Sequence, residues 1–359
     1  LMKSGFYFKN SWYDFVPTVT AAGHSCIYTG TVPYLNGIIG NEWYDTEKNE
    51  IVYCADDKSV NAIGVETVKE KYSPRNLLAS TITDELILGD KNSQVIGISL
   101  KDRGAIFPAG HHGKAFWFEE VTGKFITSSY YMDELPEWMK KFNERNLNDF
   151  YLNQNWNTLY PIETYTESTT DNVPWEYLFK GIKSPVLPYD LPALRKKNVD
   201  LLGYTPYGNS ILKDLALTVL ESEKLGKGNS TDFLSISFSS TDKVGHYFGP
   251  NSIEIEDTYL RLDKDLSEIF TYIDENIGME NALIFLTADH SVAPIPGYLE
   301  SLGVSAGNMS TKILKDSIET FLSKKYGESD WVILIENNQI YLNHKTLLEK
   351  NLSLEAIEN

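Results

Sequence analysis

Apolar residues recur at helical spacing in two long stretches of the chain. Between residues 211 and 224, positions three and four apart fall on one side of a helix: Leu212, Leu215, Ala216, Val219 and Leu220. Between residues 252 and 276 the same spacing recurs at Ile255, Tyr259, Leu262, Leu266, Ile269 and Ile273. Gly278 then supplies a typical helix end. We therefore expect two amphipathic helices that each bury one face.

Short, continuous apolar runs predict buried strands. Such runs occupy residues 94–100, 233–238 and 282–286. The order strand, helix, strand in the second half predicts a right-handed parallel crossover, which places the ends of both strands on one side of the sheet. A shorter helix is expected from Thr20 onward, with Gly30 as its stop. These elements predict an α/β fold with a mostly parallel central sheet and helices on both faces.

The chain divides by pattern into four segments. We expect residues 1–105 to form the first part of the α/β core, with the nucleophile, and residues 206–300 to form the second part, with metal ligands. Residues 106–205 are rich in Tyr, Trp, Asn and Pro with weak periodicity, which favours an insertion or cap. Residues 301–359 are interpreted as a peripheral α+β segment. They include a predicted hairpin of residues 331–335 and 339–342.

Composition excludes several classes of function. With 42% hydrophobic and 23% charged residues the chain is typical of a globular protein, and no apolar run reaches the ~20 residues of a membrane span. The net charge of −18 argues against general binding of nucleic acid. Only Cys26 and Cys54 are present, and whether they form a bridge is left open. No signal peptide is visible at the start, and we expect the chain to begin and end inside a larger protein.

Two predicted strands are each followed by an aspartate and a histidine. Asp242 and His246 follow the run at 233–238, and Asp289 and His290 follow the run at 282–286. Carboxylate and imidazole are the ligands of zinc sites that perform hydrolysis, and strand ends are where α/β enzymes hold their chemistry. One such segment could arise by chance, but the pair in matching positions predicts a metal centre.

Four further residues are candidates for phosphate chemistry, and each has a structural alternative. Thr20 at a helix N-terminus could be a nucleophile or a plain N-cap. Lys101 and Arg103 follow the run at 94–100 and could bind one anion together or form a solvated turn. Asn41 lies among glycines and could donate to a phosphoryl oxygen or form an Asx turn. The remaining histidines are left out of the site: His24, His111, His112 and His344.

Taken together, these segments resemble the threonine-nucleophile phosphomonoesterases of the alkaline phosphatase superfamily, which are relatives of the nucleotide pyrophosphatase/phosphodiesterases. The motifs that carry the resemblance are Pro17-Thr18-Val19-Thr20-Ala21-Ala22-Gly23-His24, Gly37-Ile38-Ile39-Gly40-Asn41-Glu42-Trp43-Tyr44-Asp45, Ser99-Leu100-Lys101-Asp102-Arg103-Gly104-Ala105, Thr205-Pro206-Tyr207-Gly208-Asn209, Ser239 to Pro250 and Thr287-Ala288-Asp289-His290. The resemblance implies an alkaline-phosphatase-like core and two Zn²⁺ ions, although other divalent metals could serve. It implies that Asp242 and His246 bind one ion, and that Asp289, His290 and Thr20 bind the other.

The resemblance also implies an activity. Thr20 would attack phosphorus and form a phosphothreonine that water hydrolyses, with Asn41 donating to a phosphoryl oxygen. Lys101 and Arg103 resemble the pair that marks monoesterases, so small phosphate monoesters are the expected substrates. A phosphodiesterase or nucleotide pyrophosphatase is the alternative enzyme, and a non-catalytic module that binds phosphorylated ligands is the alternative of another class. The family suggests a periplasmic or secreted location, and the oligomeric state stays open.

One departure from the family concerns the metal ligands. The family supplies one more Asp on a strand upstream of the nucleophile and one more His far downstream of the Asp-His pair. Only nineteen residues precede Thr20, and the context of His344 differs from the family's last histidine motif. Each zinc is therefore expected to lack one protein ligand, and the chain alone is expected to hold zinc weakly and to be poorly active.

Overall fold

A computed structural model of the protein describes residues 5–68 and 70–358. The helices are α1 (Thr20–Thr29), α2 (Pro33–Asn36), α3 (Ile82–Gly89), α4 (Asp102–Ala109), α5 (Glu137–Glu144), α6 (Leu147–Leu152), α7 (Leu191–Leu194), α8 (Tyr207–Ser222), α9 (Ser239–Phe248), α10 (Ile253–Asn276), α11 (Pro296–Ser301), α12 (Thr311–Tyr326), α13 (His344–Glu349) and α14 (Leu354–Glu358). The strands are β1 (Glu42–Asp45), β2 (Glu50–Tyr53), β3 (Ala62–Ile63), β4 (Val95–Ser99), β5 (Lys114–Glu119), β6 (Lys124–Ser128), β7 (Asn155–Trp156), β8 (Tyr189–Asp190), β9 (Phe233–Ser237), β10 (Val332–Glu336) and β11 (Gln339–Leu342). Short 3₁₀ turns cover Ile162–Thr164, Leu201–Tyr204 and Met279–Asn281.

The central sheet has five strands in the order β3-β6-β5-β4-β9. Strand β4 pairs in parallel with β5 and with β9, whereas β6 pairs antiparallel with both β5 and β3. The α/β class is confirmed, and the sheet is mixed because β5 and β6 are joined by a tight turn that reverses the chain. The predicted strand at 94–100 and the predicted strand at 233–238 both form and lie next to each other.

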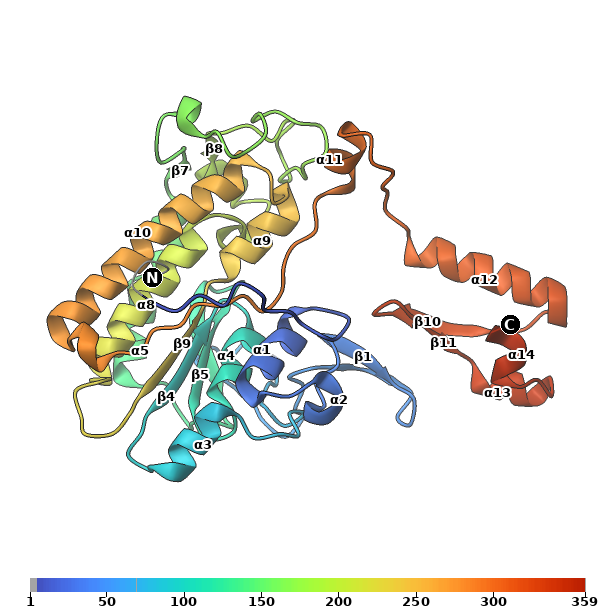
Figure 1. Ribbon diagram of the computed structural model, residues 1–359, viewed down its shortest axis with the longest axis horizontal. Helices are drawn as coiled ribbons and strands as arrows, with labels where there is room; N and C mark the ends of the chain where they lie inside the picture. Colours follow the sequence, from blue (N-terminus) through green and yellow to red (C-terminus); the bar gives the residue numbers. More distant parts are fainter. Residues whose placement is uncertain (1–4, 69, 359) are drawn as a thin grey trace.

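Two apolar cores cover the two faces of this sheet, as expected for an α/β fold. Side chains alternate along β5, so that Phe116 enters one core and Trp117 enters the other. Helices α8, α9 and α10 lie over the first face, and α1 and α4 lie over the second (Figure 1). Both predicted amphipathic helices are confirmed as α8 and α10, and Ser252 caps α10 by accepting from the Ile255 amide.

The segment predicted as an insertion contributes two strands to the sheet. Strands β5 and β6 fall within residues 106–205 but belong to the central sheet, because their alternating apolar residues serve both cores. From Ser128 to residue 205 the chain forms only short helices, 3₁₀ turns and the two-stranded pair β7–β8. Aromatic residues hold this part against α9, with Trp156, Phe179 and Tyr189 all packed around Phe248.

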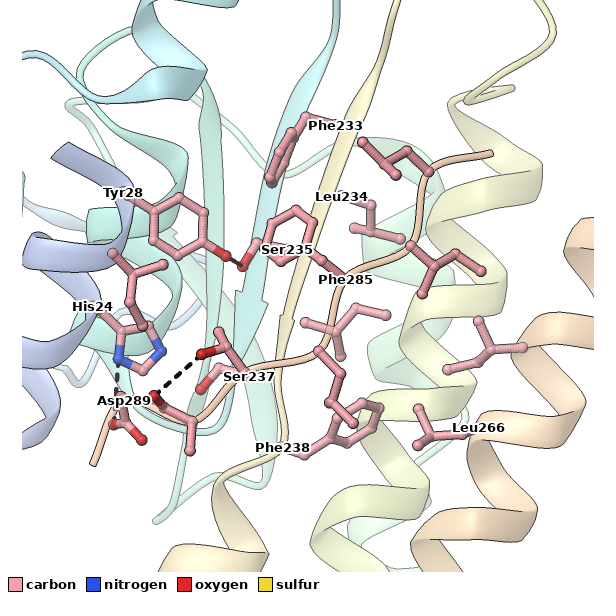
Figure 2. A pocket seen from close by; sticks show the side chains of 18 of the residues that line it. His24, Tyr28, Phe233, Leu234, Ser235, Ser237, Phe238, Leu266, Phe285 and Asp289 are labelled. Atoms are coloured by element: carbon pink, nitrogen blue, oxygen red, sulfur yellow. Dashed lines mark hydrogen bonds and ion pairs between the residues drawn. The ribbon is translucent and has the colours of Figure 1, made fainter. Parts of the chain in front are cut away.

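Residues 282–286 do not form the predicted strand, which is a correction to the sequence analysis. The segment runs roughly alongside β9 but pairs with no strand (Figure 2). Leu283 is 93% exposed and Leu286 is 69% exposed. A cavity of about 2310 Å³ lies between this segment, β9 and α10. Because the cavity separates the segment from β9, its backbone groups have no neighbouring strand to bond to.

The C-terminal segment forms a small unit of its own beside the sheet (Figure 1). The predicted hairpin is confirmed as β10 and β11, and its turn residues Asn337 and Asn338 both have positive φ, as a type I′ turn requires. Helices α12 and α13 cover the hairpin around the buried Trp331. None of the described helices is both long and apolar enough to cross a membrane.

Candidate active site

Thr20 is the first residue of α1 and is buried, with 3% of its surface exposed. The predicted helix and its Gly30 stop are both confirmed. Helix α1 packs directly on the loop that carries Asp289. A Cβ atom at Gly23 would lie 2.2 Å from the Asp289 carbonyl oxygen, so glycine is required for this approach. The contact brings the Thr20 end of α1 to the predicted metal ligands.

Asn41 is held at the start of the same helix. Its side-chain oxygen Oδ1 accepts a hydrogen bond of 3.0 Å from the backbone amide of Ala21. This bond satisfies one of the amides that every helix leaves unpaired at its N-terminus. It also orients the Asn41 side chain beside Thr20, where the predicted role would require it.

Lys101 links the nucleophile candidate to the metal-ligand candidates. It precedes α4, and its Nζ atom lies 3.3 Å from Thr20 Oγ1 and forms a close ion pair with Asp242. Burial lowers the pKa of Lys101, although the negative charge of Asp242 opposes that effect. The predicted joint action of Lys101 and Arg103 on one anion stays a prediction, because Arg103 contacts a different set of groups.

Arg103 belongs to a half-buried group that includes Tyr53, a residue absent from the sequence prediction. The Tyr53 hydroxyl donates to both carboxylate oxygens of Asp102, at 2.7 and 2.8 Å. Arg103 Nη1 in turn donates to the Tyr53 oxygen at 3.0 Å and lies 3.8 Å from Asp102 Oδ2. Arg103 Nε is buried without a partner among the described residues. Tyr53 therefore orients the guanidinium of Arg103. Because the two residues lie fifty positions apart in sequence, no local pattern predicts this role.

Asp242, His246 and His290 converge on one point. Their nearest ligand atoms all lie within 4.8 Å of one another. Asp242 Oδ1 is 3.2 Å from His246 Nε2 and 3.4 Å from His290 Nε2. Asp242 and His246 both lie on helix α9, where a separation of four positions places them on one face.

Asp289 lies close to His290, and it also contacts His24, a second residue that the sequence prediction missed. His290 Nε2 is 3.7 Å from Asp289 Oδ2, and His24 Nδ1 is 3.4 Å from the same oxygen (Figure 2). His24 was left out of the predicted site. The available signal was its spacing, because a residue four positions after Thr20 lies on the same face of the helix.

The electrostatics of this cluster favour charged carboxylates. Burial alone would raise the pKa of Asp242, but its hydrogen bond with His246 and the positive charge of Lys101 hold that pKa well below its usual range. Burial would also raise the pKa of Asp289, but its hydrogen bond with His24 lowers that pKa below its ordinary value. Two anionic carboxylates and two imidazoles in one place are suited to a divalent metal.

The structure thus brings most of the predicted site together. Thr20, Lys101, Asp242, Asp289 and His290 line one cavity. His246 adjoins them through Asp242, and Asn41 adjoins them through α1.

His111, His112 and His344 lie outside the site, as expected from the sequence. His111 is paired with Asp84 at 2.9 Å, and His112 donates its backbone amide to the same carboxylate. His344 begins α13 in the C-terminal unit, well away from α9 (Figure 1). Cys26 and Cys54 are both free, so the open question of a bridge is answered.

Comparison of the sequence with models of protein families shows to which family the chain belongs. The family model of type I phosphodiesterase / nucleotide pyrophosphatase matches residues 1–351. The chain belongs to this family. The resemblance that the motifs around Thr20, Lys101, Asp242 and Asp289 carry is confirmed at the level of the family.

Similar proteins include several alkaline phosphatases. The chain is 46% identical to alkaline phosphatase PhoV of Synechococcus elongatus over 97% of its own length and 63% of that protein. It is 42% identical to alkaline phosphatase PafA of Elizabethkingia meningoseptica, over 100% of its length and 66% of that protein. The crystal structure of PafA superposes with a TM-score of 0.93 at 43% identity, covering 97% of this chain and 67% of that one. The chain therefore spans about two thirds of the length of these relatives.

Proposed function

We propose that this family member hydrolyses phosphate monoesters with the help of zinc and through a phosphothreonine intermediate. The observation that carries the proposal is the convergence of Asp242, His246 and His290 within 4.8 Å, linked to Thr20 by Lys101. A metal-ligand cluster beside a hydroxyl at a helix N-terminus combines electrophile and nucleophile for phosphoryl transfer. The likeness to alkaline phosphatases PhoV and PafA supports the same class of reaction.

The carboxylate and imidazole side chains of the site are suited to bind divalent metal ions. Asp242, His246 and His290 would hold one ion, and Asp289 with His290 or Thr20 would contribute to a second. Bound zinc would supply positive charge to the leaving oxygen and to the nucleophile. The mixed carboxylate and imidazole set favours zinc over calcium or magnesium, which prefer oxygen alone. Other divalent transition metals fit the same donors.

Each side chain of the site then has its own role in the reaction. Thr20 Oγ1 forms a bond to phosphorus as the bond from phosphorus to the ester oxygen breaks, and the alcohol leaves. Lys101, at 3.3 Å from Thr20 Oγ1, stabilises negative charge on that oxygen. Water then attacks the phosphothreonine, which releases inorganic phosphate and restores the Thr20 hydroxyl. Asn41, oriented through the Ala21 amide, donates to a phosphoryl oxygen.

Lys101 and Arg103 favour a monoester over a diester. A monoester carries one more negative charge than a diester, and a pair of cations is matched to that charge. A solved structure of a PafA variant replaces one threonine, one asparagine, one lysine and one arginine, and superposes with a TM-score of 0.92. The first two of those positions are as far apart as Thr20 and Asn41, and the last two as far apart as Lys101 and Arg103. This match supports the four assignments.

The family description favours a second candidate, a phosphodiesterase or nucleotide pyrophosphatase. Measuring bound zinc and the hydrolysis of an aryl phosphate and of its methyl diester separates the candidates, with Thr20→Ala as the control. Two zinc ions and preference for the monoester support the proposal. Preference for the diester supports the second candidate. The absence of both bound zinc and turnover supports a module that only binds phosphorylated ligands. On the family resemblance we also propose a periplasmic or secreted location.

A further inference from the structure

Two buried glutamates outside the active site form no ion pair with any described cationic side chain. Glu254 is fully buried and Glu176 is 7% exposed. In each carboxylate the Oε2 atom is buried and makes no hydrogen bond with any described residue. A buried carboxylate oxygen without a partner is costly, so both atoms indicate something that is bound between or beside them.

The two glutamates lie where the segment after β6 meets the start of α10. The amide of Thr169 donates to the Asn251 carbonyl at 2.7 Å, and the amide of Tyr177 donates to the Tyr247 carbonyl at 3.1 Å. These bonds lay residues 169–177 alongside residues 247–251. Glu176 lies near the end of the first stretch and Glu254 lies three residues after the second, so both belong to this interface.

Glu254 is oriented at this interface by a second contact from the same segment. The Tyr189 hydroxyl donates to Glu254 Oε1 at 2.6 Å, which leaves Oε2 as the free atom. Glu254 also occupies the first turn of α10, where the helix dipole stabilises a negative charge. The bond from Tyr189 thus holds the Glu254 side chain in a defined position.

Electrostatics agree with this geometry. Burial, together with the negative charges of Glu254 and Asp171, raises the pKa of Glu176 to about 9. Burial likewise raises the pKa of Glu254 to about 8. The groups that act on Glu176 are all acidic, and no lysine, arginine or histidine is among those that act on either glutamate. If both carboxyl groups are ionised, no described side chain among those that act on them supplies the positive charge to balance them.

We propose that Glu176 and Glu254 hold a divalent cation of the calcium class, which fastens the segment after β6 to α10. The donors are oxygens alone, which suits calcium or magnesium and distinguishes this place from the imidazole-containing cluster around Asp242. No third Asp, Glu, His or Cys among the described residues converges with the pair. The proposed ion would take its remaining ligands from main-chain oxygens and water, as is common for calcium.

Terbium luminescence tests the site. Tb³⁺ shares the oxygen preference of Ca²⁺ and emits when a nearby aromatic ring is excited. Tyr189, bonded to Glu254, and Trp175, adjacent to Glu176, are the donors. The experiment uses the full chain loaded with zinc, so that the catalytic cluster is filled. We expect one Tb³⁺ per chain, displaced by Ca²⁺, and a higher melting temperature when Ca²⁺ is added.

Matched variants make the result specific. The double variant Glu176→Gln and Glu254→Gln should bind Tb³⁺ at least about tenfold more weakly and lose the response to Ca²⁺. Glu256→Gln is the control, because Glu256 has a buried free oxygen on the same helix but is not among the groups that act on the pair. If the double variant misfolds, Glu176→Gln alone keeps the Tyr189 bond and gives the same comparison.

Two results would overturn the proposal. Equal Tb³⁺ emission from the parent and the double variant would place the ion elsewhere. A melting temperature that falls between pH 6 and pH 9 and that Ca²⁺ does not restore would mean that the pair shares a proton instead. In that case the raised pKa values make the folded state bind more protons than the unfolded state, so stability declines as pH rises.

Discussion

Removing the hydroxyl of Tyr53 should weaken monoester hydrolysis without removing any group that touches the substrate. Tyr53→Phe keeps the ring, which packs on Tyr72 with centroids 5.1 Å apart. It deletes the hydroxyl that donates to Asp102 and accepts from Arg103. Among the described residues, the guanidinium then keeps the 3.8 Å contact with Asp102, which is too long to orient it.

The expected size follows from the bond that is lost. A hydrogen bond to a charged group contributes about 1.5–3 kcal/mol. If that orientation acts mainly on the transition state, kcat/KM for an aryl phosphate falls roughly tenfold to a hundredfold, at about 1.4 kcal/mol per factor of ten. The methyl diester lacks the extra charge that Arg103 is proposed to meet, so its kcat/KM should change little.

Initial rates on both esters, at equal zinc content, measure the effect. Tyr72→Phe is the matched control, because no described group forms a hydrogen bond with the Tyr72 hydroxyl although its ring adjoins Tyr53. Equal losses on the monoester and the diester would refute the reasoning, since they would mean a general structural defect. So would an equal loss in Tyr72→Phe. A melting curve for each variant separates lost stability from lost positioning.

Four other outcomes are expected. Thr20→Ala should abolish monoester turnover while zinc measured by mass spectrometry stays near the parent value; activity within about tenfold of the parent would refute the nucleophile. Arg103→Ala should cost about 2–4 kcal/mol in kcat/KM for the monoester and much less for the diester, by the same paired assay. Asp84→Asn should lower the free energy of unfolding at pH 7 by about 2 kcal/mol in urea titrations. Burial alone would raise the pKa of Asp84, but its bond with His111 holds that pKa at about 2, so the ionised carboxylate stabilises the fold. The parent should lose that stability as pH falls from about 4 to about 2, and the variant should not. Asn337→Ala should remove the 2.6 Å bond to the Glu42 carbonyl and raise KM more than it lowers kcat, because the loop of Asn41 loosens; an unchanged KM would refute this.

Much of the fold was predictable because its signals are local. Helix α10 has apolar residues at helical spacing, a Ser252 cap and Gly278 beyond its end, and each of these features acts within a few residues. Helix α1 and the hairpin β10–β11 were predictable for the same reason, since Gly30 and the two asparagines adopt the positive φ that they tolerate best.

The failures share a different cause, because each depends on a distant partner. Residues 282–286 have the composition of a strand, but a strand needs a neighbour, and the described chain places a cavity there. Tyr53 and His24 carried no motif of their own. Their roles come from packing against Arg103 and Asp289, which lie 50 and 265 positions further along the chain.

The placement of the candidate site follows from one register. Strands β4 and β9 run in parallel with Ser99 opposite Ser237, and the hydroxyls of Ser99 and Ser239 lie 3.1 Å apart. Lys101 follows Ser99 by two residues, and Asp242 follows Ser237 on the first turn of α9. A shift of either strand by one residue would turn its side chains to the opposite face and separate this ion pair. The cation that contacts Thr20 and the carboxylate of the metal-ligand cluster therefore meet because two neighbouring parallel strands end at the same level, and α1 needs only the glycine at position 23 to join them.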